Sequence, residues 1–245
     1  MADMITGRNA VMEALRSERE IEKLMVGKGT EGSIRKIIGM AKEKKIPIQY
    51  REKQALDRIA KTGNHQGVIA QVSEYLYCGL EDILARAAER GEDPFLIVLD
   101  GLEDPHNLGA IMRTAECCGA HGIVIPKRRS AAVTGTVAKA SAGAIEYMLC
   151  ARVSNIGQAV DQLKERGVWI AACDMDGQNY TRQDLTGSLA LVIGSEGAGI
   201  SRLVREKCDF TVSIPMKGKI TSLNASNAAA ILMYEVVRQR DGQTV

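Results

Sequence analysis

The sequence is poor in aromatic residues and has no long apolar run. Both absences exclude classes of binding site or of protein. Of its 245 residues only two are Phe, six are Tyr and one is Trp, so extensive stacking of nucleic-acid bases on aromatic rings is not expected. Apolar stretches such as Phe95–Leu99 are far shorter than the roughly 20 residues that cross a bilayer. The first residues, MADMITGRN, lack the basic and apolar regions of a secretory signal. We therefore expect a cytoplasmic protein that contacts no membrane.

Several cofactor and metal motifs are also missing. No two of the six cysteines are spaced as Cys-x-x-Cys or in another zinc-like pattern, so we expect reduced, buried thiols and no metal site. No segment matches GxxxxGK[ST], which argues against a P-loop enzyme. The glycines at 194, 197 and 199 are spaced GxxGxG rather than GxGxxG, which argues against a dinucleotide site at this turn and hence against a nucleotide-binding oxidoreductase.

Charge is distributed unevenly along the chain. Residues 1–75 carry fourteen Lys and Arg against ten Asp and Glu, whereas the remainder carries eighteen against twenty. A basic N-terminal part is compatible with a polyanionic partner, although a solvated surface would look the same.

Periodicity predicts a small α/β unit followed by a larger one. In the first 75 residues, helices are expected at 7–17 and 34–44, and strands at 23–26, 46–50 and 67–72. A linker with a helix at 80–90 ends at Gly91-Glu92-Asp93-Pro94. Beyond it, near-continuous apolar strands alternate with helices, the pattern of a parallel sheet covered on both faces. The expected strands are 95–99, 123–125, 147–153, 169–173, 189–193 and 210–214, and the expected helices are 108–118, 156–166, 200–207 and 225–240.

Three polar blocks follow expected strands in this second part. They are Asp100–Gly119 (DGLEDPHNLGAIMRTAECCG), Leu189–Ser201 (LALVIGSEGAGIS) and Ile214–Asn227 (IPMKGKITSLNASN). Open α/β sheets bind ligands where their strands end. We therefore expect the three blocks to build one composite site.

Each block also has a purely structural interpretation. Asn107 could cap a helix and leave Arg113 in solvent, and Gly194–Gly199 could be a glycine turn with Glu196 at a helix start. The third block is harder to explain in this way, because one capping residue would suffice and Ser222-Leu223-Asn224-Ala225-Ser226-Asn227 offers several. Its surplus amide and hydroxyl groups favour a ligand site.

Together the blocks resemble the three motifs of the SpoU branch of the SPOUT methyltransferases, over roughly Phe95 to Arg240. Asn107-x-Gly109-x-x-x-Arg113 is similar to motif one and Gly194-Ser195-Glu196-Gly197 to motif two. Ile214-Pro215-Met216 with Ser222-Leu223-Asn224 is similar to motif three. Asn227 departs from the pattern, since relatives commonly carry a small apolar residue there, and this puts the back wall of the pocket in question.

The N-terminal part carries a narrower resemblance. With Gly7-Arg8-Asn9 and His65-Gln66-Gly67, it is similar to the ribosomal-protein-like substrate domain of bacterial 23S rRNA guanosine 2′-O-methyltransferases. The two resemblances imply an α/β fold, with a small substrate-binding domain before a parallel-sheet SPOUT methyltransferase domain that ends in a trefoil knot. The expected boundaries are 1–75 for the RNA-binding domain, 76–93 for the linker and 94–245 for the catalytic domain.

The resemblance also implies an activity: transfer of a methyl group from S-adenosylmethionine to the ribose 2′-hydroxyl of a guanosine in 23S rRNA, by a homodimer. It places the cofactor among the groups of Gly194, Ser195, Ile214, Met216 and Leu223. The implied catalytic set is Asn107, Arg113, Glu196, Ser222 and Asn224. Methylation of tRNA, and RNA binding without turnover on the same fold, are the alternatives.

Roles for the catalytic set follow from their chemistry. A guanidinium stays protonated, so Arg113 is a poor base, and we expect it to hold the target phosphate and stabilise the developing alkoxide. Glu196 would orient Arg113 or Asn107, while Ser222 and Asn224 would position ribose and donor. The basic residues Lys127-Arg128-Arg129, Lys217 and Lys219 could line the RNA cleft or be solvated surface.

Overall fold

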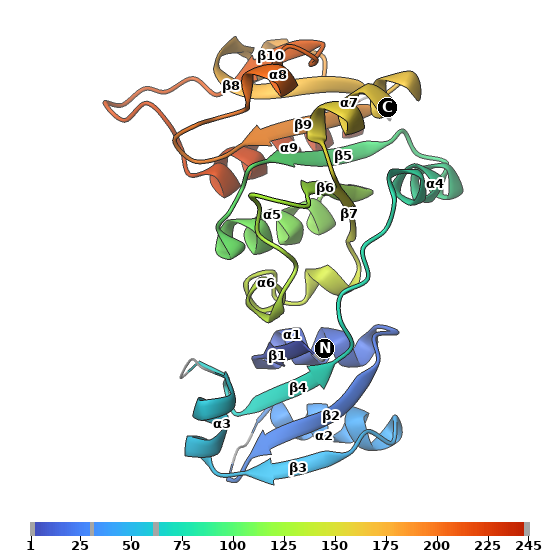
Figure 1. Ribbon diagram of the computed structural model, residues 1–245, viewed down its shortest axis with the longest axis vertical. Coiled ribbons are helices and arrows are strands. Elements are labelled where there is room, and N and C mark those ends of the chain that lie inside the picture. Colours follow the sequence, from blue (N-terminus) through green and yellow to red (C-terminus); the bar gives the residue numbers. More distant parts are fainter. Residues whose placement is uncertain (1–2, 30–31, 61–63, 243–245) are drawn as a thin grey trace. The chain divides into compact units, whose positions relative to one another are not determined.

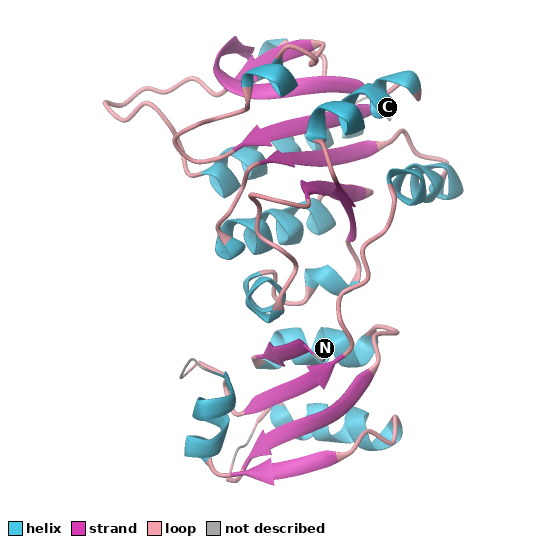
Figure 2. Ribbon diagram, viewed as in Figure 1, coloured by secondary structure: helices cyan, strands magenta, loops and turns pink. Residues whose placement is uncertain are grey.

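The chain folds into two compact units. The computed structural model describes residues 3–29, 32–60 and 64–242. The first unit combines the chain up to Leu76 with the segment Ala132–Tyr147, and the second comprises Tyr77–Ala131 and the chain from Met148 onward. Their elements are drawn in Figures 1 and 2.

The first unit is built on a four-stranded sheet with the strand order β1-β4-β2-β3. Strand β4 runs antiparallel to β1 and β2, while β2 and β3 are parallel. The helices and strands expected in this part are confirmed, whereas β1 and α3 are additional. The elements are β1 (Asp3–Thr6), α1 (Arg8–Arg16), β2 (Ile21–Gly27), α2 (Ile34–Glu43), β3 (Ile48–Arg51), α3 (Lys53–Ala60), β4 (Val68–Val72), α6 (Gly135–Ala140) and η1 (Ala144–Glu146).

The segment Ala132–Tyr147 belongs to the first unit because of specific contacts with it. The carboxylate of Glu146 accepts a hydrogen bond from Arg19 at 3.0 Å, and only 4% and 9% of these side chains are exposed. The hydroxyl of Tyr147 donates to Glu13 at 2.7 Å, which raises the pKa of Tyr147 to about 12. Helix α6 packs against β1 so closely that a Cβ on Gly135 would lie 1.9 Å from a backbone oxygen.

The second unit contains a six-stranded sheet with the order β10-β8-β9-β5-β6-β7, and all of its strands are parallel. The predicted parallel sheet is therefore confirmed. The elements are α4 (Leu80–Arg90), β5 (Phe95–Asp100), α5 (Pro105–Cys117), β6 (Gly122–Pro126), β7 (Leu149–Val153), α7 (Ile156–Glu165), β8 (Trp169–Asn179), η2 (Tyr180–Arg182), β9 (Leu189–Gly194), α8 (Arg202–Arg205), β10 (Phe210–Ser213) and α9 (Ala225–Asp241).

Helices cover both faces of this sheet, as its apolar strands require. Alternate strand residues such as Leu96 and Val98 join one core with Ile83 of α4 and Val160 of α7. Helices α5 and α9 pack against each other and against β6 and β9, on the opposite face in Figure 1. The two layers leave the carboxyl ends of the strands open for a site.

The helix of the first polar block starts earlier than its sequence suggested. Asp104 is its N-cap, because its side chain accepts from the backbone N–H of His106 at 2.9 Å, and Pro105 occupies the first turn. Asn107 therefore does not cap the helix, and the capping interpretation is wrong. Other expected boundaries shift as well: α8 is shorter than 200–207, β8 continues to Asn179, and the strand expected at 147–153 begins only at Leu149.

The cysteines are free thiols, but they are not uniformly buried. Cys150 is buried, Cys117 is exposed and the other four are half-buried, so the expectation of burial is wrong for Cys117. Desolvation raises the pKa of Cys78, Cys118 and Cys208 to about 11. Within the described ranges, no three His, Cys, Asp or Glu side chains gather as metal ligands.

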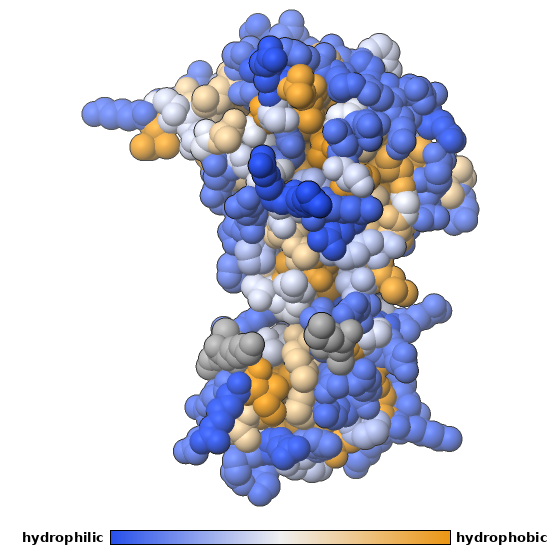
Figure 3. Space-filling model, in the orientation of Figure 1, coloured by the Kyte–Doolittle hydropathy of each residue, from blue (hydrophilic) through white to orange (hydrophobic). Residues whose placement is uncertain are grey.

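The surface is mainly hydrophilic where Figure 3 shows it, with apolar side chains visible between polar ones. None of the helices in the described part of the chain has the length and apolar character needed to span a bilayer.

Candidate active site

The three polar blocks meet at the carboxyl edge of the six-stranded sheet. Strands β5 and β9 are neighbours in that sheet, and β10 lies beyond β8 on the same side. Parallel strands end at the same edge, so the residues after β5, β9 and β10 can approach one another. The side chains of Asn107, Glu196 and Asn224 do so.

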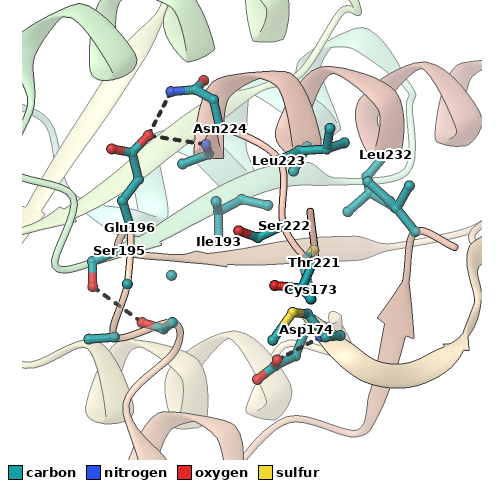
Figure 4. Close-up of a pocket in the computed structure, with 18 of the residues that line it drawn as sticks. Cys173, Asp174, Ile193, Ser195, Glu196, Thr221, Ser222, Leu223, Asn224 and Leu232 are labelled. Carbon is teal, nitrogen blue, oxygen red and sulfur yellow. Dashed lines mark hydrogen bonds between the residues drawn. The ribbon is translucent and has the colours of Figure 1, made fainter. Parts of the chain in front are cut away.

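These three side chains form a closed hydrogen-bonded network. Asn107 donates through Nδ2 to Oε1 of Glu196 at 3.0 Å, and Asn224 donates through Nδ2 to the same oxygen at 2.6 Å. Asn224 also donates to Oδ1 of Asn107 at 3.0 Å. Each block thus contributes one member, and Figure 4 shows Glu196 pointing toward Asn224.

Asn224 has a second task at the start of α9. Its Oδ1 accepts from the backbone N–H of Ser226 at 3.0 Å and of Asn227 at 3.3 Å, as an N-cap does. Both N–H bonds of its amide are used in the network, so the side chain is fully engaged within the protein. No donor in the described residues reaches Oε2 of Glu196, which leaves that oxygen available at the site.

A glycine turn holds Glu196 in place. A Cβ at Gly194 would lie 2.1 Å from the carbonyl carbon of Gly199, so only glycine fits there. The turn is closed by mutual backbone hydrogen bonds between Ser195 and Gly199, at 3.1 and 3.0 Å. Asp100 at the end of β5 accepts from the N–H of Ser201 at 2.8 Å and ties this turn to the first block.

A cavity of about 620 Å³ opens beside this network, a volume within the range of small-molecule sites. Its wall includes apolar side chains such as Ile193, Val212 and Leu232. The residues expected from the sequence that line it are Gly194, Ser195, Glu196, Ile214, Met216, Ser222, Leu223 and Asn224. Of the expected catalytic residues, Asn107 contacts this set through its hydrogen bonds without lining the cavity.

One wall of the cavity, formed by the segment after β10, has backbone N–H and C=O groups that are not used in backbone–backbone hydrogen bonds within the described chain. Between Ile214 and Leu223, the chain makes no backbone–backbone hydrogen bond with any residue that the structure describes. Backbone polar groups require partners, and Ile214, Met216 and Leu223 are among the residues that line the cavity. An apolar wall with free backbone donors and acceptors fits the adenine and ribose of S-adenosylmethionine.

Sequence reasoning missed the wall contributed by β8. Cys173, Asp174 and Met175 line the cavity across from Glu196, as Figure 4 shows for the first two. Asp174 is held by Arg205 at 3.2 Å. The signal was present in the sequence, because polar residues follow the apolar run of this strand just as they do in the three blocks.

Other expected residues lie outside the cavity. Arg113 is exposed on α5, lines neither of the two cavities described here, and forms no hydrogen bond or ion pair with the described residues. Lys217 and Lys219 are exposed and also line neither cavity. Asn227 is exposed, and the adjacent Ala228 lines the wall instead, so the unusual residue does not alter the cavity.

Comparison with known proteins agrees with this geometry. Residues 94–234 match the model of the SpoU rRNA Methylase family, and residues 4–78 match that of RNA 2′-O ribose methyltransferase substrate binding. The chain is 52% identical over 241 residues to YacO of Bacillus subtilis, which is assigned to the TrmH family of tRNA/rRNA methyltransferases, covering 98% of this chain and 96% of that one. A Staphylococcus aureus relative with the same assignment is 46% identical, covering 97% and 96%.

A solved structure shares both the fold and the cofactor assignment. The SpoU methyltransferase AviRb from Streptomyces viridochromogenes, determined with AdoMet, superimposes with a TM-score of 0.83 at 27% identity, covering 98% of this chain and 90% of that one. AdoMet is S-adenosylmethionine, the ligand for which the cavity is suited. The chain therefore belongs to the SpoU rRNA methylase family and is an S-adenosylmethionine-dependent RNA methyltransferase.

Proposed function

We propose that the enzyme methylates the ribose 2′-hydroxyl of a guanosine in 23S rRNA. The observation that carries this proposal is the network of Asn107, Glu196 and Asn224 beside the donor cavity, together with an N-terminal match to a 2′-O ribose methyltransferase substrate-binding model. In this proposal residues 1–75 bind the RNA, residues 76–93 connect, and residues 94–245 carry out the chemistry in the cytoplasm.

The residues of the cavity bind and orient. Bound donor supplies a methyl group on a sulfonium, which is a good leaving group, so the protein mainly has to align the acceptor with it. Gly194, Ile214, Met216 and Leu223 would hold the adenosyl part through backbone groups. Ser222 is exposed, lines the cavity and has no hydrogen-bond partner in the described chain, so its hydroxyl can contact donor or ribose.

The network would position the acceptor side of the site. Asn107 and Asn224 fix Oε1 of Glu196, so the carboxylate keeps one orientation and presents Oε2 to the reacting ribose or to Arg113. Arg113 would bind the target phosphate and stabilise the alkoxide that forms as the hydroxyl loses its proton. If an Arg113→Ala enzyme folds, binds donor and keeps the full rate, Arg113 has no such role.

We further propose that the enzyme is a homodimer whose C-terminal region forms a trefoil knot. Helix α9 packs on α5 yet leaves Ile231 and Tyr234 exposed to 37% and 53%. Exposed apolar side chains on the outer side of this helix pair would be covered by a second copy. Sedimentation equilibrium of the full chain tests the dimer, and a monomer at micromolar concentration would overturn it.

Transfer of labelled methyl from S-adenosylmethionine to unmodified 23S rRNA and tRNA transcripts tests the reaction. We expect label in 23S rRNA at an alkali-resistant linkage, because a 2′-O-methyl group blocks cleavage of the adjacent phosphodiester. Label only in tRNA would keep the chemistry and replace the substrate, which is the alternative that the tRNA/rRNA assignment of relatives leaves open. Alkali-labile label would exclude the ribose as the acceptor. Donor binding without transfer to either transcript would mean that neither RNA is the substrate.

A further inference from the structure

A second cavity lies beside the donor cavity in the same unit. Its volume is also about 620 Å³, and it shares Ser195, Ala198 and Gly199 with the donor cavity. The glycine turn after β9 therefore forms a common wall between the two. Whatever occupies the second cavity lies next to the donor.

Two arginines that have no partner among the described residues line this second cavity. Arg128 and Arg129 follow β6, are exposed, and form no ion pair or side-chain hydrogen bond with any part of the chain that the structure describes. A guanidinium is always charged and offers several donors in one plane, a geometry that matches a phosphate. Exposed arginines are common on protein surfaces, so the backbone and the charges around Arg128 and Arg129 decide whether they form a binding site.

The loop that carries these arginines is fixed at both ends. Ser130 donates through Oγ to the carbonyl of Pro126 at 2.6 Å, and the N–H of Ala131 donates to Leu102 at 2.8 Å. The N–H of Lys127 donates to Val153 at 2.8 Å. Arg129 itself has a φ of 54°, in the left-handed region that residues with a Cβ rarely adopt. The backbone thus fixes the positions from which both arginine side chains extend.

The remaining charges of the cavity are mostly used within the protein. Lys207 is paired with Asp161, and Asp100 accepts from Ser201. Glu103 is exposed and is the acidic lining residue that lacks a partner among the described residues. Three cationic and two anionic side chains line the cavity, so its lining carries a net charge of +1 and favours an anion.

The start of α7 adds neutral donors to the same cavity. The N-cap Asn155 satisfies the N–H of Gln158 at 3.1 Å, while Ile156 and Gly157 line the cavity and their N–H groups meet no acceptor in the described ranges. First-turn N–H groups are unpaired within a helix and favour anions. They supplement the arginines.

We propose that this second cavity binds the RNA nucleotide adjoining the methylated one, whose phosphate is held by Arg128 and Arg129. The inference rests on the proposed 2′-O-methylation of RNA. A ribose presented to the donor must continue into the neighbouring nucleotides of its strand, and the cavity across the shared turn is the adjacent space that carries free cationic groups. Phosphate binding there would fix the register of the strand without reading its bases.

Substitution of the two arginines in the full-length enzyme tests this subsite. Arg128→Ala removes one guanidinium. Arg129→Gly removes the other and places at φ 54° the residue that best tolerates this conformation, so folding should be unaffected. Arg182→Ala is the matched control, because Arg182 is exposed in the same unit, has no partner in the described residues and lines neither cavity.

The measurements are the Kd of an unmodified 23S rRNA transcript at several KCl concentrations, the Kd of S-adenosylmethionine, and methyl transfer at saturating transcript. We expect each cavity variant to weaken transcript binding about tenfold and to reduce the slope of log K against log salt by about 0.7. The donor Kd and the kcat at saturating transcript should stay within about twofold of the parent, because no group in the donor cavity changes.

Two results would overturn the subsite. Either Arg128→Ala and Arg129→Gly bind the transcript as Arg182→Ala does, or they lower kcat while transcript binding is unchanged. Failure of the proposed function looks different: the parent enzyme would then bind transcript without forming alkali-resistant label. In that event, weaker and less salt-dependent binding by the two cavity variants would still support an RNA-phosphate subsite.

Discussion

Replacing Asn107 with Asp separates the two interpretations of this residue, because they predict changes of opposite sign. The substitution keeps the shape of the side chain but turns its Nδ2 donor into an oxygen. Asn107 lies in the first turn of α5, where a negative charge stabilises a helix by about 0.3–1 kcal/mol. If Asn107 were simply a helix-start residue, the variant would be as stable as the parent or slightly more stable.

The network predicts a clear loss instead. The Nδ2 atom lies 3.0 Å from Oε1 of Glu196, so the variant would place two carboxylate oxygens at that separation. Two unit charges at this distance repel by about 1.4 kcal/mol in water and about 5.5 kcal/mol at an effective dielectric constant of 20. Glu196 is exposed, so the lower part of this range applies, and loss of the hydrogen bond adds about 1 kcal/mol. After the helix-dipole gain is subtracted, we expect a net loss of about 2–3 kcal/mol.

Thermal unfolding at two pH values measures this loss and identifies its cause. A loss of this size lowers Tm by about 5–10 °C for a domain of this length. Repulsion raises the carboxyl pKa values in the folded variant, so the folded state binds more protons than the unfolded state and stability falls as pH rises. The Tm deficit of Asn107→Asp relative to the parent should therefore be larger at pH 8 than at pH 5. An equal deficit at both pH values, or no deficit, would refute the network.

Three further predictions concern separate parts of the molecule. Gly194→Ala places a Cβ 2.1 Å from the backbone of the facing turn and should abolish binding of S-adenosylmethionine in calorimetry, whereas Gly218→Ala, whose Cβ meets nothing within 4 Å, should not. Desolvation lowers the pKa of His121 in the folded state. As pH drops below about 6.5, the unfolded state therefore binds a proton before the folded state does, and the free energy of unfolding should fall. His121→Gln should reduce this pH dependence in denaturation curves. Glu146→Gln removes the counter-charge of Arg19, whose side chain is 9% exposed, and should cost about 3 kcal/mol in urea unfolding. A loss below about 1 kcal/mol would show that this pair behaves like a surface ion pair.

Much of the second unit could be predicted from its sequence because its strands are buried on both faces. An apolar run such as Leu189–Ile193 leaves little choice but a central parallel strand, and its residues are buried in β9. Polar residues directly after such strands indicated where the site would be. The expected cofactor residues line the cavity for that reason, whereas their individual roles stay predictions.

Contacts between distant surface-type residues could not be predicted in this way. Arg19 and Glu146 are 127 positions apart, and each resembles an ordinary solvated charge in its local sequence. Glu146 belongs to η1, which packs against α1, the helix that precedes Arg19. No local periodicity in the sequence predicts this packing. The position of Arg113 could not be predicted either. Its helix was expected, but whether its side chain reaches the cavity depends on where α5 begins.

The membership of Ala132–Tyr147 in the first unit bears on how RNA binding and catalysis are connected. The chain passes between the units at three places, after Leu76, after Ala131 and after Tyr147. The second passage comes directly after the fixed loop of Arg128 and Arg129. If the first unit binds RNA as proposed, its RNA contacts are joined by continuous chain to the proposed phosphate subsite at that loop. Consequently, Glu146→Gln should weaken transcript binding along with stability, whereas a purely local ion pair would leave the Kd of the transcript unchanged.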